Sequence, residues 1–199
     1  MGHLQAFDVQ NLIDSFNLKG YIETGTGVGD SLSHALKFEF QQLFSIDFDK
    51  ELYQRALINF PDSRLKLINN LSRLALPEIL KNISTKDNFL FFLDAHFPKA
   101  DFGTGPDRYV KSCTDYGKDA IPLEEELKII SEYRGQSKDV ILIDDVWIYE
   151  DGPFEGGNWS ERQKLTIGDR NFISKTFQKT HDMTINYKHQ GYFVLTPKR

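Results

Sequence analysis

Three glycines at alternate positions, Gly25, Gly27 and Gly29, follow a short apolar run that ends in Glu23. Glycine adopts backbone conformations that other residues avoid, so such a loop can turn sharply and leave room for a flat ligand against the main chain. A helical pattern follows over about 30–38. The segment therefore predicts a strand, a glycine loop and a helix that together form a nucleotide-type pocket, with the Glu23 carboxylate ready to accept from an amino or hydroxyl group.

The glycine spacing differs from two common phosphate-binding loops. A dinucleotide loop reads G-x-G-x-x-G, and Asp30 stands where its third glycine belongs, because Gly29 comes one residue early. A phosphate loop of the G-x-x-x-x-G-K-[ST] type needs a lysine that is absent here. An ordinary glycine-rich turn without a ligand stays open as an alternative at this point.

A second acid supports a cofactor pocket. The segment 42–47 predicts a strand that ends in Asp47, which follows Glu23 at close to the spacing, about 20 residues, at which a strand-end acid meets ribose hydroxyls. A carboxylate can accept two hydroxyl hydrogen bonds side by side. Asp49 is the alternative to Asp47 for this role, and it is also a candidate N-cap for a helix over about 50–58.

Along the chain, predicted strands alternate with predicted helices, which indicates an α/β fold with a doubly wound, mostly parallel sheet and helices on both faces. A closing hairpin requires one antiparallel strand. The expected strands are 20–23, 43–47, 65–68, 89–93, 140–143, 182–188 and 191–196. The expected helices are 7–17, 30–38, 50–58, 72–82, 123–134 and 169–179. We expect one domain over 1–199, with irregular lid or substrate-binding loops at about 97–122 and 150–168.

Composition excludes several function classes. With 199 residues, 40% hydrophobic and 27% charged, the chain has the composition of a soluble globular domain. The net charge of −5 and the lack of a basic face argue against nucleic acid as a partner. The apolar run 89–93 is too short to span a membrane, and no secretory signal is visible at the N-terminus. The single Cys113 fits a reducing compartment, so we expect a cytoplasmic protein.

Acidic residues follow two of the predicted strands. The strand 89–93 leads into Asp94 and His96, and the strand 140–143 leads into Asp144 and Asp145. In the expected topology these strand ends lie side by side, next to the glycine loop. Carboxylates held close together repel unless a proton or a cation neutralises them. Hard oxygen ligands suit Mg²⁺, Mn²⁺ or Ca²⁺, so the sequence predicts a divalent metal site here.

These motifs resemble those of class I S-adenosylmethionine-dependent methyltransferases, and in particular the metal-dependent O-methyltransferases of the catechol, caffeoyl-CoA and macrocin types. The resemblance covers about 20–147 and implies a Rossmann-like, seven-stranded sheet with an antiparallel last strand. It implies a cofactor site formed by Glu23, Gly25, Thr26, Gly27, Gly29, Asp47, Ser72 and Asp94, with Ser72 beside the adenine. It implies Asp94, Asp144 and Asp145 as metal ligands.

The resemblance also implies a mechanism. The metal would lower the pKa of an acceptor hydroxyl, a base would remove its proton, and the oxygen would attack the cofactor's methyl group. His96, two residues after Asp94, is the leading candidate for the base, with Lys99 and His34 as weaker ones. We expect S-adenosylmethionine and Mg²⁺, or in its place Mn²⁺ or Ca²⁺, as cofactors and a small molecule or sugar as the acceptor.

The two long loops contain further candidates. Aromatic side chains there could stack on a sugar or aryl acceptor: Tyr109, Tyr116, Trp147, Tyr149, Phe154 and Trp159. Four acids in the first loop are alternative ligands or solvated loop residues: Asp101, Asp107, Asp115 and Asp119. Three glycines would give the second loop mobility: Gly152, Gly156 and Gly157.

Other interpretations stay open. The same fold could hold a metal-independent methyltransferase, an oxidoreductase that uses a nicotinamide cofactor, or a protein that binds S-adenosylmethionine without catalysis. Asp30 at the third glycine position disfavours the nicotinamide alternative. A homo-oligomer is also open, because the sequence does not reveal the oligomeric state.

Overall fold

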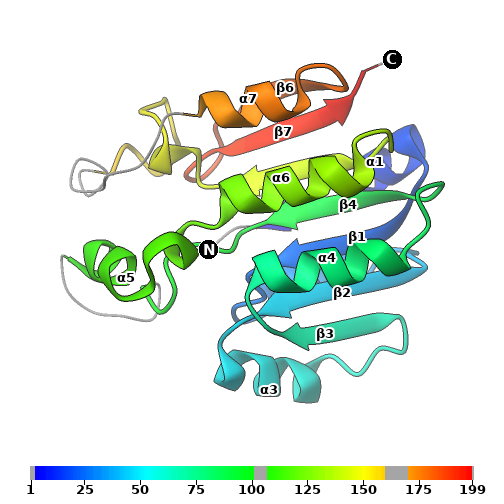
Figure 1. The fold of residues 1–199 in the computed structure, drawn as a ribbon, viewed down its shortest axis with the longest axis horizontal. Coiled ribbons are helices and arrows are strands. Elements are labelled where there is room, and N and C mark those ends of the chain that lie inside the picture. The colour runs from blue at the N-terminus through cyan, green and yellow to red at the C-terminus, as the bar shows by residue number, and fades with distance from the viewer. Residues whose placement is uncertain (1–2, 101–106, 160–169, 199) are drawn as a thin grey trace.

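The computed structural model describes residues 3–100, 107–159 and 170–198. Its centre is a seven-stranded sheet in the order β3-β2-β1-β4-β5-β7-β6. Among the strands of these ranges, β7 alone runs opposite to the others, as its arrow in Figure 1 shows, so its pairs with β5 and β6 are antiparallel. The prediction of a mostly parallel sheet with an antiparallel last strand is therefore confirmed.

The strands lie within a few residues of the predicted positions. Their bounds are β1 (Leu18–Thr24), β2 (Gln42–Asp47), β3 (Leu65–Asn69), β4 (Asn88–Leu93), β5 (Val140–Asp144), β6 (His181–Asn186) and β7 (Tyr192–Pro197). Parallel strands β1, β2, β4 and β5 end at the same edge, which is the edge at which ligands bind in open α/β sheets.

The helices connect the strands. Their bounds are α1 (Val9–Phe16), α2 (Asp30–Ala35), α3 (Lys50–Asn59), α4 (Ser72–Asn82), α5 (Arg108–Tyr116), α6 (Leu123–Arg134) and α7 (Asn171–Phe177), with short 3-10 turns η1 (Leu4–Ala6), η2 (Gly117–Ala120) and η3 (Val146–Ile148). The Asp49 carboxylate accepts from the Glu51 and Leu52 amides, which confirms it as the N-cap of α3.

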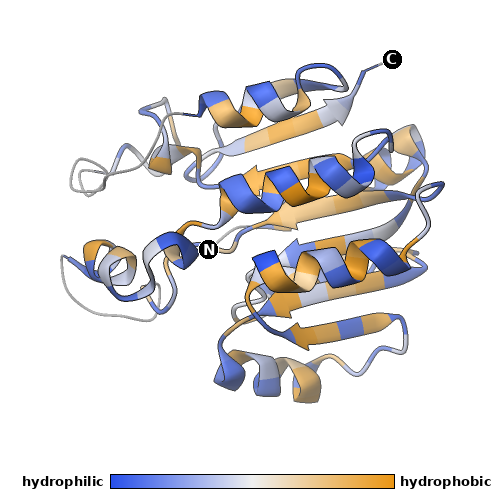
Figure 2. Ribbon diagram, viewed as in Figure 1, coloured by the Kyte–Doolittle hydropathy of each residue, from blue (hydrophilic) through white to orange (hydrophobic). Residues whose placement is uncertain are grey.

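Helices cover both faces of the sheet because successive strand residues point to opposite sides. On one face, side chains such as Phe89 and Phe91 pack with α4, α6 and α7. On the other, Leu90 and Phe92 pack with residues of η1, α1 and α2. Buried on both faces, β4 is hydrophobic along most of its length (Figure 2).

At the amino ends of β4 and β5, away from the ligand-binding edge, a buried ion pair fixes the chain. Arg134 Nε lies 2.6 Å from Asp139 Oδ2, and Asp139 Oδ1 accepts from the Phe89 amide at 2.7 Å. His181 Nε2 lies 2.9 Å from the Asp139 carbonyl oxygen. These contacts join α6, β4, β5 and β6, so the sheet is held firmly at the end opposite the loops.

Two sequence-based expectations need correction. The segment predicted as an irregular loop at 97–122 contains the helix α5 and the turn η2, so Cys113 lies in a helix and not in a polar loop. The helix expected over 30–38 ends at Ala35, whereas the one expected over 7–17 is present as α1. Much of the loop predicted at 150–168 lies outside the described residues.

In the described parts of the chain, no helix is both long enough and apolar enough to cross a membrane.

Candidate active site

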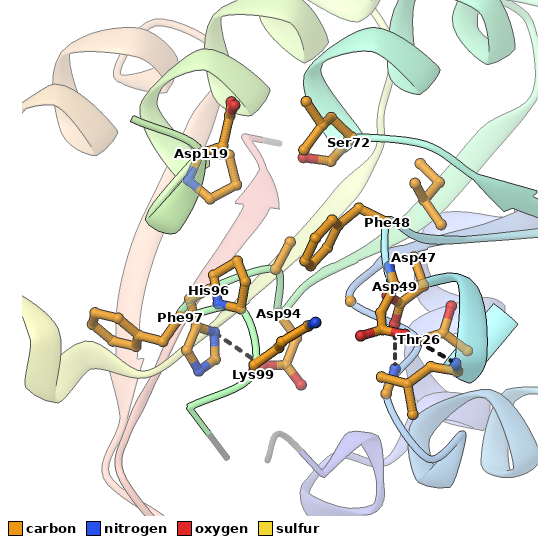
Figure 3. A pocket seen from close by; sticks show the side chains of 18 of the residues that line it. Thr26, Asp47, Phe48, Asp49, Ser72, Asp94, His96, Phe97, Lys99 and Asp119 are labelled. Atoms are coloured by element: carbon orange, nitrogen blue, oxygen red, sulfur yellow. Dashed lines mark hydrogen bonds and ion pairs between the residues drawn. The ribbon is translucent and has the colours of Figure 1, made fainter. Parts of the chain in front are cut away.

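A cleft opens at the carboxyl ends of β1, β2 and β4 (Figure 3). The loops after these strands and the start of α4 form its walls, and residues 97–99, 119 and 122 close one side. The lining includes Gly25, Thr26, Gly27, Asp47, Ser72, Asp94 and His96. Most residues predicted for the cofactor therefore meet around one space.

The structure explains why each of the three loop positions is a glycine. All three have positive φ, at +79° for Gly25, +56° for Gly27 and +90° for Gly29. A side chain at Gly25 would collide with the backbone of Asp94, and one at Gly29 with the Phe60 ring. A Cβ at Gly27 would meet no atom of the described residues within 4 Å, so this glycine leaves open space beside the cleft.

Asp47 is held by the loop that it faces. Its Oδ2 accepts from the Gly27 amide at 2.8 Å, and its Oδ1 accepts from the Asp49 amide at 2.8 Å. Burial raises the pKa of Asp47, while these two amide hydrogen bonds oppose the shift. The Asp47 carboxylate thus lines the cleft in a fixed orientation, which suits a partner for ribose hydroxyls.

Glu23 does not line the cleft, although the sequence predicts it as a cofactor contact. Its Oε1 accepts from Ser45 Oγ at 2.6 Å and its Oε2 accepts from the Tyr21 hydroxyl at 2.7 Å, and the residue is only 1% exposed. Burial raises the pKa of Glu23 to about 8. Thr26 Oγ1 also contacts Ser45 Oγ, so Glu23 supports the glycine loop from beneath.

The wall formed by residues 97–99, 119 and 122 is tied to the rest of the cleft. Arg73 Nε, from the first turn of α4, lies 2.6 Å from Asp119 Oδ1. The rings of Phe48 and Tyr116 meet edge to face, with centroids 5.5 Å apart. Phe48, Arg73 and Asp119 all line the cleft, and none of them is among the predicted cofactor residues.

His96 lies between two of the predicted acids. Its Nε2 is 2.6 Å from Asp145 Oδ2, and its Nδ1 is 3.2 Å from Asp94 Oδ1 (Figure 3 shows the latter). A neutral imidazole has one donor and one acceptor nitrogen, so donation from both requires the imidazolium. The shorter contact favours a proton on Nε2, which leaves Nδ1 on the side of Asp94 and the cleft.

The three acids around His96 differ in the direction and cause of their pKa shifts. Burial raises the pKa of Asp94 to about 6, although His96 opposes the shift. Burial, together with Asp145 and Asp94, raises the pKa of Asp144 well above its usual range. Burial would also raise the pKa of Asp145, but the charge and hydrogen bond of His96 outweigh it and lower that pKa. Asp145 is therefore the acid of this group that ionises most readily.

The predicted metal ligands come together, but they are not arranged around a cation. Asp94, Asp144 and Asp145 interact with one another, and their hard oxygens suit a divalent ion. However, His96 takes the contacts of Asp94 and Asp145. Within the described ranges, no group of three or more His, Cys, Asp or Glu side chains could hold a metal ion. In this arrangement the residues do not fit a metal, and the metal role stays a prediction.

The weaker base candidates are placed differently. Lys99 lines the cleft and is exposed, with a positive φ of +63°. His34 lies on α2, packs edge-on against Phe38 and is not among the cleft residues. Of the loop acids, Asp119 pairs with Arg73, and Asp115 pairs with Lys111 on the surface. Asp107 is the N-cap residue of α5, and Asp101 lies outside the described residues.

The loop aromatics do not form an open stacking surface. None of the six predicted residues lines the cleft. Tyr109 and Trp147 are buried and pack on each other and on Trp159, with the Trp147 and Trp159 rings stacked at 4.8 Å. Phe154 is also buried. These side chains hold the two loop segments together, so their predicted role as an acceptor platform is wrong for the buried members.

The predicted site does not include Glu126, on the first turn of α6, although the structure places it close to the cleft. It is 1% exposed and lies beside Ser72 and Thr24, near His96 and Asp94. Burial raises the pKa of Glu126 to about 7. A signal for it exists in the sequence, since Leu123, Glu126, Leu127 and Ile130 follow the helical spacing of a core-facing stripe. A glutamate within such a stripe points inward.

Comparison with solved structures identifies the fold. A Staphylococcus aureus protein assigned as a caffeoyl-CoA O-methyltransferase matches all of this chain and 85% of its own, with a TM-score of 0.57 and 14% identity. CalS10, an amino pentose methyltransferase of Micromonospora echinaspora with bound S-adenosylmethionine, matches 98% of this chain and 91% of its own, with a TM-score of 0.57 and 14% identity.

An O-methyltransferase of Bacillus cereus, in complex with S-adenosylhomocysteine, matches all of this chain and 82% of its own, with a TM-score of 0.54 and 15% identity. No protein-family model and no curated protein sequence matches the chain. The chain therefore has the fold of the S-adenosylmethionine-dependent methyltransferases, and this likeness lies in the structure and not in close sequence similarity.

Gly27→Ala tests whether the open space beside the loop belongs to a ligand. Gly157 is a matched control, because it too has positive φ and no atom of the described residues within 4 Å of an added methyl group, but it lies outside the cleft. Both variants should lose about 1–2 kcal/mol of unfolding free energy. Only Gly27→Ala should weaken S-adenosylhomocysteine binding in calorimetry. Equal affinities in the two variants would contradict a ligand at this loop.

Asp47→Asn separates the two candidate ribose acids. Loss of a charged acceptor that faces the cleft should weaken S-adenosylhomocysteine binding about 10- to 100-fold, since hydrogen bonds to charged groups contribute about 1.5–3 kcal/mol. Asp49→Asn should bind normally, because asparagine also caps helices. The same calorimetric titration of both variants decides the point, and a larger effect from Asp49→Asn would reverse the assignment.

Glu23 gives a pH dependence to stability. Its pKa rises from 4.5 in the unfolded chain to about 8 in the fold, mainly through burial. Between these values the unfolded chain ionises and the folded chain stays protonated, so stability present below pH 4.5 is lost as the pH rises toward 8. Glu23→Gln should reduce this slope by up to about 1.4 kcal/mol per pH unit.

Urea denaturation at a series of pH values measures this slope. The exposed Glu39→Gln is the control and should leave the slope as in the wild type. An unchanged slope in Glu23→Gln would show that this carboxyl is ionised in the folded protein.

Proposed function

We propose that this protein is a methyltransferase that transfers the methyl group of S-adenosylmethionine to a hydroxyl group of a small molecule or sugar. The observation that carries the proposal is the position of His96 and Asp94 on the same cleft as the glycine loop and Asp47. A cofactor site and a proton acceptor therefore share one space. O-methyltransferases among the structures of the same fold support the choice of a hydroxyl acceptor.

In this proposal the cofactor lies along the carboxyl edge of the sheet. Gly25 and Gly27 admit its amino acid end, the Asp47 carboxylate accepts from its ribose hydroxyls, and Ser72 lies beside the adenine. The lining of the cleft by all four residues supports this orientation. The Arg73–Asp119 ion pair would then close the wall on the adenine side. When bound, the cofactor's sulfonium supplies the activated methyl group.

His96 serves as the general base. The contact of Nε2 with Asp145 Oδ2 at 2.6 Å orients the ring and keeps the Nε2 proton in place. Nδ1, at 3.2 Å from Asp94 Oδ1, can accept the proton of an acceptor hydroxyl that enters beside Asp94. The acceptor oxygen would take the methyl group from the cofactor's sulfonium, which would leave S-adenosylhomocysteine as a thioether and the acceptor's proton on His96. Holding the two reactants in line is the larger contribution of the protein.

His96→Ala tests this role. We expect S-adenosylmethionine to bind with nearly unchanged affinity, while methyl transfer to hydroxyl acceptors falls about 10²- to 10⁴-fold. His34→Ala is the matched control, because His34 lies on α2 outside the cleft and should leave both quantities unchanged. Calorimetry with S-adenosylmethionine and S-adenosylhomocysteine measures binding, and transfer of a labelled methyl group to a panel of phenols and sugars measures activity.

The outcomes separate the alternatives. Absence of binding by either cofactor form would overturn the proposal. Binding without transfer to any acceptor would favour a non-catalytic S-adenosylmethionine-binding protein. Because His96 takes the contacts of Asp94 and Asp145, we expect transfer to persist in a strong chelator. Loss of transfer in chelator, with recovery on added Mg²⁺ in the wild type but not in Asp144→Ala, would instead support the predicted metal assistance.

A further inference from the structure

A small recess lies next to the cleft at the carboxyl ends of β4 and β5. Ala95 and His96 line both spaces, so the recess and the cleft share a wall. The remaining lining is mostly apolar, from residues such as Leu93, Ile143 and Ile148. Two acids, Glu126 and Asp144, interrupt this apolar surface.

Both acids have a buried oxygen whose hydrogen-bonding capacity is unmet. Glu126 Oε1 and Asp144 Oδ2 make no hydrogen bond with any of the residues that the structure describes. The residues are 1% and 5% exposed. Buried polar atoms in proteins are nearly always hydrogen-bonded, because an unmet carboxylate oxygen is costly in a low-dielectric interior. Two such atoms on residues of one recess indicate that a donor binds there.

The charge and size of the recess narrow the choice of donor. The carboxyl groups of Glu126 and Asp144 lie in a mostly apolar lining, and a donor that carries a positive charge makes stronger hydrogen bonds to carboxylates than a neutral one. The recess holds about 20 Å³, close to the space of one water molecule. A hydrated Mg²⁺ ion needs several waters and is too large. A primary ammonium group has the size of water and donates three hydrogen bonds.

We propose that the recess binds a primary ammonium group of the methyl acceptor. The inference rests on the proposed function and specifies its substrate class: a small molecule with a hydroxyl group for His96 and an amino group a few bonds away for Glu126 and Asp144. Amino sugars and aminoalkyl phenols have this pattern. Ala95 and His96 line both the cleft and the recess, so the two groups of such an acceptor would bind on adjacent sides of the same residues.

Methylammonium chloride is the probe for this site, with methanol as its neutral counterpart and sodium chloride as the ionic-strength control. In NMR titrations of the isotope-labelled protein, methylammonium should give saturable shifts at the amides of Ala95 and Tyr149, which line the recess. Glu126→Gln should weaken this binding about tenfold or more. Asp144→Asn is a second variant and should weaken it in the same direction. Glu125→Gln, an exposed neighbour on the same helix, should leave it unchanged.

Each other outcome overturns the inference. Equal shifts with methanol, no saturation, or no effect of Glu126→Gln would show that the recess does not select a cation. Displacement of methylammonium by lower concentrations of Mg²⁺ would assign the recess to a metal ion. The titration is run with and without S-adenosylhomocysteine, whose own binding is measured first. Failure of S-adenosylhomocysteine to bind counts against the proposed function, whereas failure of methylammonium alone counts against this inference.

Discussion

The close approach of β1 to β4 is the constraint on which the site depends. The chain leaves β1 at Gly25, whose absent side chain allows the backbone of Asp94 to lie against it. Strand pairing continues to the last residues, with Thr24 opposite Leu93. Any other residue at position 25 would separate the glycine loop from the end of β4. The glycine loop and Asp94 are thus joined by backbone contact, and not by side chains that could move apart.

Burial of charge is the second constraint, and the protein meets it in different ways. Beneath the loop, Glu23 stays neutral and shares its hydrogen bonds with Tyr21 and Ser45. At the cleft, Asp47 is satisfied by two backbone amides. At the ends of β4 and β5, His96 Nε2 lies 2.6 Å from Asp145 Oδ2 and provides the hydrogen-bond partner of that carboxylate. Across the described part of the chain, the buried carboxylate oxygens without a hydrogen-bond partner belong to two acids that line the recess. For this reason the recess points to a ligand.

The sequence predicts the fold well because its signals are local. Apolar runs such as 89–93, glycines at a turn and the helical spacing of apolar residues each act over a few positions. Asp47, Asp94 and His96 can be placed at one edge because parallel strands end together. The direction in which Glu23 points cannot be predicted, since it depends on Ser45 of the neighbouring strand. The helix α5 escapes prediction because its stability comes from packing between distant segments, as with Tyr109 against Trp147.

The backbone conformation of Asp145 also depends on residues that are distant in the sequence. Asp145 has a φ of +63°, a conformation that costs free energy for a residue with a side chain and persists only where the surroundings hold it. The next two amides supply that hold: Val146 donates to the Gly191 carbonyl at 3.0 Å and Trp147 to that of Gln190 at 3.2 Å.

Gly191 can take part because its φ of +88° and its lack of a side chain let the turn before β7 lie against Phe154 and Val146. The turn between β6 and β7, remote in sequence from the cleft, therefore fixes the backbone that directs the Asp145 carboxylate to His96. A change in that turn would act on the histidine through Asp145, without contact with either the cofactor or the acceptor. The reversed last strand of this fold thus contributes to the chemistry of the site as well as to the sheet.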